Sequence, residues 1–147
     1  MNKKILLTIL AIIALLTLLF VLSKNFYTGK SDIDLRKFDT ILADNSNLRE
    51  LGLGKRDSLS ENSIMLFVFD YPSDYAFWMK DMKFNIDIIW LDETYRVVYI
   101  SENISPNTYP QVFSPDKKAK YVIEGNAFFA RKNKIQIGDK VLLNKTQ

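Results

Sequence analysis

The stretch FWMKDMKFNIDIIWLD, residues 77–92, sets charged side chains beside large aromatic ones. Trp78, Lys80 and Asp81 bring an indole, an ammonium and a carboxylate within four consecutive residues. An aromatic face with a few convergent polar groups is the usual composition of a small-ligand pocket. The stretch therefore predicts a site for an uncharged polar ligand, such as a sugar or a fragment of a cell wall.

Composition excludes the common nucleophilic and zinc-dependent reactions. The chain has no cysteine and no histidine, so it contains no Ser-His-Asp or Cys-His arrangement and no Cys/His zinc site. We expect no metal and no cofactor. Glycoside hydrolysis by two carboxyl groups about 5 to 9.5 Å apart remains open, with Asp87, Asp92 and Glu124 as candidates. We expect binding rather than catalysis, and we assign no catalytic residue.

One long apolar run lies at the N-terminus. Residues 5–23, ILLTILAIIALLTLLFVLS, carry no charge, and Lys24 closes the run. A helix of this length rises about 28 Å, at about 1.5 Å per residue, which matches the hydrocarbon core of a bilayer. A cleaved secretory signal usually has a shorter apolar region that ends at small residues. We therefore expect residues 1–23 to be a retained transmembrane anchor, with a cleaved signal as the alternative.

The position of this span sets the expected topology. The segment before it is too short to fold, so we expect a single-pass membrane protein with residues 24–147 outside the cytoplasm. The lysines and arginines that flank the span do not favour that orientation by themselves. Residues 24–36, KNFYTGKSDIDLR, are polar and predict a tether, and residues 37–147 then form the folded domain.

The charge balance gives no indication of a nucleic-acid partner. The first 24 residues hold three of the 20 basic residues and none of the 17 acidic ones, so residues 25–147 carry 17 of each sign. A nucleic-acid-binding domain gathers a basic excess on one face. We therefore expect no nucleic acid among the partners, which leaves the membrane and a small polar or carbohydrate ligand.

The exported part has the pattern of many short strands with two short helices. Apolar runs and alternation, bounded by turn residues, predict strands at 38–42, 64–69, 84–91, 96–102, 120–124 and 140–143. Capping residues precede a short helix at 47–51, and Gly125-Asn126 precedes a second at 127–132. Residues 92–95 form a hairpin turn. We predict an α+β fold, mostly β, built as a small barrel or a curled antiparallel or mixed sheet.

Six ordered blocks resemble a known family. GLGKRDSL (52–59), MLFVF (65–69), FWMKDMKFNIDIIWLD (77–92), RVVYI (96–100), KYVIEGNA (120–127) and IQIGDKV (135–141) are similar to blocks of domain of unknown function 192, the DUF192 family. The resemblance covers nearly all of the exported part. It implies a small β-rich, barrel-like domain, often with an N-terminal signal or anchor, and no established activity.

The polar and amphipathic positions in these blocks are the candidate ligand contacts: Arg56, Trp78, Lys80, Asp81, Asp87 and Glu124. In a binding module, Trp78 with Tyr99 or Tyr121 would form a stacking surface, and the charged residues would fix the ligand.

A structural or partner-docking envelope domain is the alternative. Asp87 would then accept backbone N–H groups or pair with Arg56, and Trp78 would cap the end of the barrel. Docking would also need an exposed apolar patch, for which Phe128 and Phe129 are the candidates.

Several positions depart from the family pattern. The chain has Gly54 where members usually have methionine, and Asp81-Met82 where they usually have Asn-Thr. Tyr95 and Phe128 occupy positions where members usually have glycine. Glycine at such positions would suit a positive φ, which is unfavourable for a larger residue.

Overall fold

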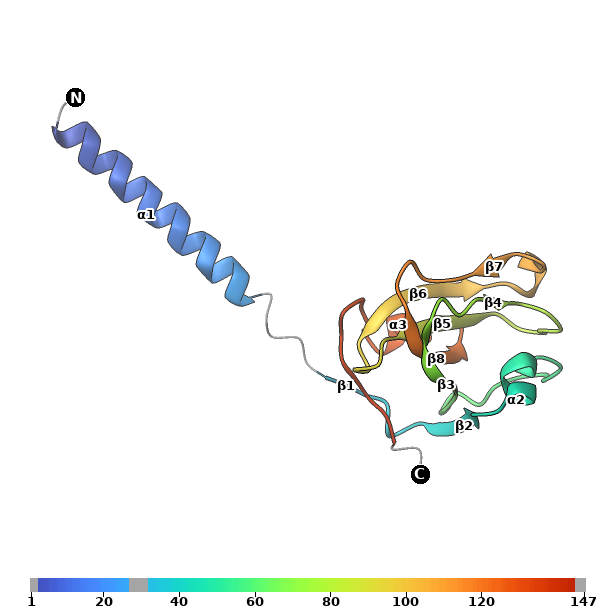
Figure 1. The fold of residues 1–147 in the computed structure, drawn as a ribbon. Helices are drawn as coiled ribbons and strands as arrows, with labels where there is room; N and C mark the ends of the chain where they lie inside the picture. The colour runs from blue at the N-terminus through green and yellow to red at the C-terminus, as the bar shows by residue number, and fades with distance from the viewer. Residues whose placement is uncertain (1–2, 27–31, 145–147) are drawn as a thin grey trace. The chain divides into compact units, whose positions relative to one another are not determined.

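The computed structural model describes residues 3–26 and 32–144, which belong to two compact units divided between residues 31 and 32. The first unit contains α1 (Lys3–Phe26), which runs three residues into the range predicted as a tether (Figure 1). Its stretch Lys3–Phe20 has a mean hydropathy of 2.3, and none of it is buried within the protein. This helix is long and apolar enough to cross a membrane.

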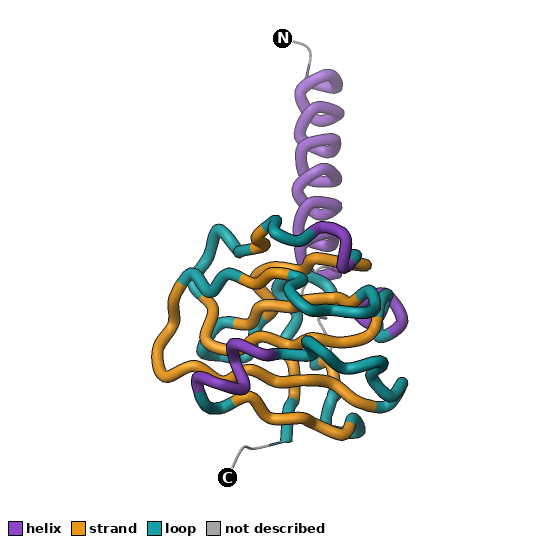
Figure 2. The backbone as a smooth tube through the Cα atoms, turned by 90° about the vertical axis from the view of Figure 1, so that its right-hand side faces the viewer, coloured by secondary structure: helices purple, strands orange, loops and turns teal. Residues whose placement is uncertain are grey.

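A five-stranded sheet forms the centre of the second unit. Its strand order is β2 (Asp39–Ala43), β3 (Ser63–Ser73), β8 (Ala119–Asn126), β5 (Ile86–Leu91) and β6 (Val97–Ile104) (Figures 1 and 2). The β2–β3 pair is parallel, and the other pairs are antiparallel. The prediction of a mostly β, α+β fold with a mixed sheet is confirmed.

Two short sheets and three short helical segments complete the unit. β1 (Ile33–Asp34) pairs in parallel with β9 (Val141–Leu142), and β4 (Phe77–Trp78) pairs antiparallel with β7 (Val112–Phe113). The helical segments are α2 (Ser46–Leu51), the 3-10 turn η1 (Pro106–Thr108) and α3 (Phe129–Lys132). The β1 strand lies within the range predicted as a tether, where the Leu35 N–H also donates to the Leu142 carbonyl at 2.9 Å.

The expectation of a barrel is wrong, because the central sheet stays open between its edge strands β2 and β6. A closed barrel has one interior, whereas this sheet carries a separate apolar core on each face. On β5, Ile86, Ile88 and Trp90 enter one core, and Ile89 and Leu91 enter the other. Both faces are covered, so all six β5 residues are buried.

Local sequence explains the turns that connect these strands. The Asn45 side chain accepts a hydrogen bond from the Leu48 N–H at 3.0 Å and so caps α2. In the β5–β6 turn, Asp92 Oδ1 accepts hydrogen bonds from the Thr94 and Arg96 N–H groups at 2.8 and 3.0 Å. Each turn thus depends on a short polar side chain that bonds to its own backbone.

Candidate ligand-binding cavity

A cavity of about 270 Å³ opens on one face of the central sheet. Its wall comes from α2 and the turn after it (49–53), Phe69 of β3, residues 75–78 through β4, the loop positions 80 and 82, and Glu124 of β8. Most of these segments are loops or strand ends, held in place by the packed strands behind them.

Glu124 forms the floor of this cavity and is only 4% exposed. Its Oε2 accepts a hydrogen bond from the Leu53 N–H at 3.3 Å. Its Oε1 has no hydrogen bond. Among the described residues, every fully enclosed side-chain oxygen or nitrogen has a hydrogen bond, so Oε1 is not fully enclosed and faces the cavity. Burial raises the pKa of Glu124 to about 7, although the Leu53 N–H acts in the opposite direction.

Gly52 lets the turn after α2 close over this carboxyl. A Cβ added at Gly52 would lie 3.3 Å from Oε2 and 3.5 Å from Oε1 of Glu124. Its φ of +53° is also a conformation that glycine adopts readily. A side chain at this position would therefore press on the buried acid and strain the backbone.

One wall of the cavity is a stack of flat groups. The rings of Phe69 and Tyr75 stack with their centroids 3.5 Å apart, and the Arg49 guanidinium carbon lies 5.3 Å from the Phe69 centroid. Arg49 Nη1 also donates to the carbonyls of Asp44 and Val68, at 2.7 and 2.9 Å. These contacts hold the guanidinium in one orientation.

Trp78 and Lys80 lie at the mouth of the cavity. Trp78 is 44% exposed, and its indole meets Tyr109 edge-on at 6.0 Å between centroids. The Lys80 ammonium lies 5.6 Å from the Trp78 ring centroid, within the range of a cation–π contact. Lys80 also lines a neighbouring hollow of about 280 Å³, together with Glu50 and Asp81.

Asp87 lies on the opposite face of the sheet from Glu124. Glu124 is paired in register with Ile88, so its side chain shares the face of Ile88, whereas Asp87 is one residue away and points the other way. Asp87 is completely buried and accepts hydrogen bonds from the N–H groups of Asn103, Phe128 and Ala130 at 2.7, 3.0 and 2.9 Å. These bonds give it a structural role at the start of α3.

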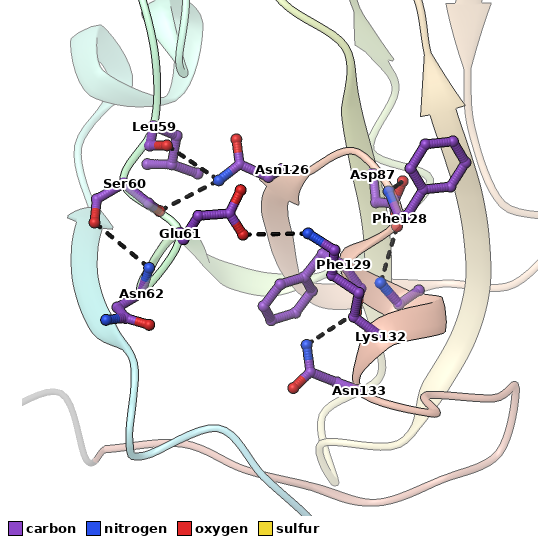
Figure 3. A network of polar contacts seen from close by, with 11 residues as sticks. Leu59, Ser60, Glu61, Asn62, Asp87, Asn126, Phe128, Phe129, Lys132 and Asn133 are labelled. Atoms are coloured by element: carbon purple, nitrogen blue, oxygen red, sulfur yellow. Dashed lines mark hydrogen bonds and ion pairs between the residues drawn. The ribbon is translucent and has the colours of Figure 1, made fainter.

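Figure 3 shows Asp87 beside Phe128 in a wider network around α3. The Asn126 amide donates to the Leu59 and Ser60 carbonyls at 3.1 and 3.3 Å, and Lys132 pairs with Glu61 at 3.2 Å. The network fastens the turn before β3 to α3, and it does not reach the cavity.

The other sequence candidates do not join the cavity. Arg56 is exposed and does not line it, and Asp81 lines only the neighbouring hollow. Tyr99 and Tyr121 are also absent from its wall, so neither of them forms the expected stacking surface with Trp78 in this cavity. Tyr99 packs against Trp90, and Tyr121 stacks on Tyr95.

Sequence reasoning missed Arg49, Phe69 and Tyr75. Arg49 is ordinary in a short helix, Phe69 ends an apolar run, and Tyr75 lies in a loop. They meet only because α2 packs beside β3, a contact between distant segments that local sequence does not show.

The sequence model of the DUF192 family, described as an uncharacterized ACR, matches residues 28–143 and so includes every residue of the cavity wall. The chain belongs to the DUF192 family. No curated protein matches it.

Two solved structures resemble this DUF192 protein. A protein of unknown function from Novosphingobium aromaticivorans has a TM-score of 0.66 and 29% identity, and the match covers 70% of this chain and 73% of that one. A candidate transcription regulator from Sinorhizobium meliloti has a TM-score of 0.67 and 25% identity, with 70% and 79% covered. These two neighbours share the fold and do not identify an activity for this chain.

The positions where this chain differs from the usual DUF192 pattern have an unusual backbone geometry or a close contact. Tyr95 and Phe128, which stand where the family usually has glycine, have φ values of 65° and 66°. A Cβ at Gly54 would lie 2.7 Å from the Leu51 carbonyl oxygen, so the usual methionine would displace this turn. In the described residues, no three His, Cys, Asp or Glu side chains group as a metal site.

Proposed function

We propose that this DUF192 protein is a membrane-anchored, extracytoplasmic module that binds a small polar, carbohydrate-like ligand without transforming it. One observation carries the proposal: the buried Glu124 carboxyl has a single hydrogen bond from the protein and turns its other oxygen toward the cavity. Buried polar groups are normally hydrogen-bonded. A polar group of a ligand in the cavity would complete the bonding of Glu124.

The size and walls of the cavity suit a ligand of one sugar ring. Its volume of about 270 Å³ lies near the lower end of small-molecule pockets. The indole of Trp78 at the mouth offers an aromatic surface for the apolar face of a ring, and Glu124 offers a hydrogen-bonding group beneath it. Aromatic stacking above a polar floor orients a ligand that has both kinds of surface.

The two alternatives have less support. A hydrolase would need a second carboxyl facing Glu124, but the sequence candidates Asp87 and Asp92 do not line the cavity, and Glu50, which does line it, is exposed to solvent. The docking alternative relied on an apolar patch at Phe128 and Phe129, but Phe129 is 4% exposed and belongs to the core. Binding without chemistry therefore remains the function that the geometry supports best.

The proposed ligand binding is tested by tryptophan fluorescence of the full chain in detergent during titration with monosaccharides. A saturable change is expected, and Trp78→Ala should remove it. Trp90 is fully buried, and its unchanged emission in the variant would report an intact fold. An unchanged response in Trp78→Ala would contradict the proposed site.

The proposed membrane placement is tested with a single introduced cysteine. The chain has none, so Ser114→Cys, at an exposed position of the second unit, gives one reactive thiol. In intact cells that express the full chain, a maleimide that cannot cross membranes should label this thiol. Labelling only after lysis would place the domain inside the cell and contradict the topology.

A further inference from the structure

We infer that the ligand carries an anionic group, held at the cavity mouth by Arg49 and Lys80 above the carboxyl of Glu124, as in a sugar acid. This inference rests on the proposed function and names the chemical class of the ligand.

Arg49 presents a fixed cation with unused donors. Both hydrogens of Nη1 are accounted for by the Asp44 and Val68 carbonyls. The remaining N–H groups make no hydrogen bond or ion pair with the described residues. A guanidinium already held by backbone carbonyls and by the Phe69 ring loses little further freedom when it binds a carboxylate or a phosphate.

Lys80 supplies a second cation in the lining of the cavity. It is exposed, its ammonium lies over Trp78, and no described acidic group is within ion-pair distance of it. It contributes to both the cavity and the neighbouring hollow. An acidic group placed between Arg49 and Lys80 would therefore meet two cations that have no carboxylate partner in the described part of the protein.

Some basic residues outside the cavity do have a carboxylate partner. Lys83 binds Asp57 at 2.6 Å, and Arg131 binds Glu102 at 3.2 Å. Glu50 also lines the cavity, but it pairs with neither Arg49 nor Lys80. While Glu124 is protonated, the lining of the cavity thus holds two cations and one anion, which gives a positive excess.

Glu124 makes this preference dependent on pH. The charged or titratable groups that share its cavity are Arg49, Glu50, Tyr75 and Lys80. Because burial raises its pKa to about 7, the Glu124 carboxyl is neutral at lower pH and can donate a hydrogen bond to the ligand. Above this pKa it is ionised and repels an anion, so binding should weaken as the pH rises through 7.

Three sugars with the same ring test the inference on the full chain in detergent: glucose is neutral, glucuronate is anionic and glucosamine is cationic. At pH 6, tryptophan fluorescence should show glucuronate binding about tenfold tighter than either of the others. At pH 8 the advantage of glucuronate should shrink. Glu124→Gln, which cannot ionise, should make the affinity for glucuronate the same at pH 6 and at pH 8.

Variants that remove one charge show which residues cause the preference for glucuronate. Lys80→Gln should weaken glucuronate binding about tenfold more than it weakens glucose binding. The matched control, Lys83→Gln, removes a lysine that is paired with Asp57 outside the cavity and should have no effect. Arg49→Gln should act like Lys80→Gln. Arg49 also donates to backbone carbonyls, so Arg49→Gln could fail to fold for that reason. In that case the result for the exposed Lys80 decides whether the ligand is anionic.

The outcomes separate this inference from the proposed function. Equal binding of all three sugars would overturn the anionic preference and leave the binding module in place. Tighter binding of glucosamine would overturn it in favour of a cationic ligand. No fluorescence response to any of the three sugars at millimolar concentration would count against both the anionic preference and the proposed binding function.

Discussion

Replacing Glu124 with glutamine should stabilise the folded domain at pH 8 and leave its stability nearly unchanged at pH 5. Burial raises the pKa of Glu124 from 4.5 to about 7. Between these values the folded state keeps a proton that the unfolded chain has lost, so stability falls as the pH rises. Above pH 7 this loss amounts to about 3 kcal/mol, at about 1.4 kcal/mol per unit of pKa. Glutamine resembles the neutral acid and does not ionise.

Urea unfolding of residues 32–147, the compact unit that contains all the sheets, measures this effect. The buried Trp90 reports unfolding by its fluorescence. Asp34 and Asp57 have lowered pKa values, because Arg36 and Lys83 donate hydrogen bonds to their respective carboxyls. They affect stability at more acid pH and equally in both proteins, so the difference between variant and parent isolates Glu124.

Glu93→Gln, at an exposed position, is the matched control and should show no pH-dependent difference from the parent. The reasoning is refuted if Glu124→Gln is less stable than the parent at pH 8, or if its stability depends on pH as strongly as that of the parent. Either result would mean that the folded protein stabilises an ionised Glu124 with a partner or with water.

Three further substitutions test the fold around the cavity, each by urea unfolding. Asp87→Asn should lower the free energy of unfolding by about 3 kcal/mol, because an amide cannot accept hydrogen bonds from all three N–H groups. The control Asp116→Asn, at an exposed position, should change the free energy of unfolding little. Equal effects of the two substitutions would contradict the structural role of Asp87. Gly54→Ala should cost about 1 to 3 kcal/mol, because its Cβ would meet the Leu51 carbonyl oxygen, and no loss would mean that the turn yields. Phe128→Gly should add about 1 kcal/mol to the free energy of unfolding by relieving a φ of 66°, and a loss of stability would contradict this reading of the strain.

Local patterns predicted the strands and turns well, because each depends on neighbouring residues. The alternation along residues 86–91 reappears as the division of β5 between two cores. The capping residues before α2 and the turn at residues 92–95 were both predicted, and in each a side chain accepts a hydrogen bond from a nearby backbone N–H group. The strand predicted at 64–69 extends to Ser63–Ser73, past a change of register after Val68 that the sequence does not indicate.

The candidate site was harder to predict, because it depends on how strands pair. Asp87 and Glu124 looked equivalent as buried acids, but a one-residue difference in register directs them to opposite faces of the sheet. One carboxyl then receives three backbone hydrogen bonds, and the other receives one. Only the pairing of β5 with β8 reveals this difference, and the open sheet in place of a barrel follows from the same kind of long-range information.

The parallel pairing of β1 with β9 has a mechanical consequence. Tension that reaches the second unit from its N-terminal end would load β1 first. There the Ile33 and Leu35 N–H groups hold the carbonyls of Lys140 and Leu142 at 2.7 and 2.9 Å. Such a pull would have to break these two hydrogen bonds before it reached the central sheet.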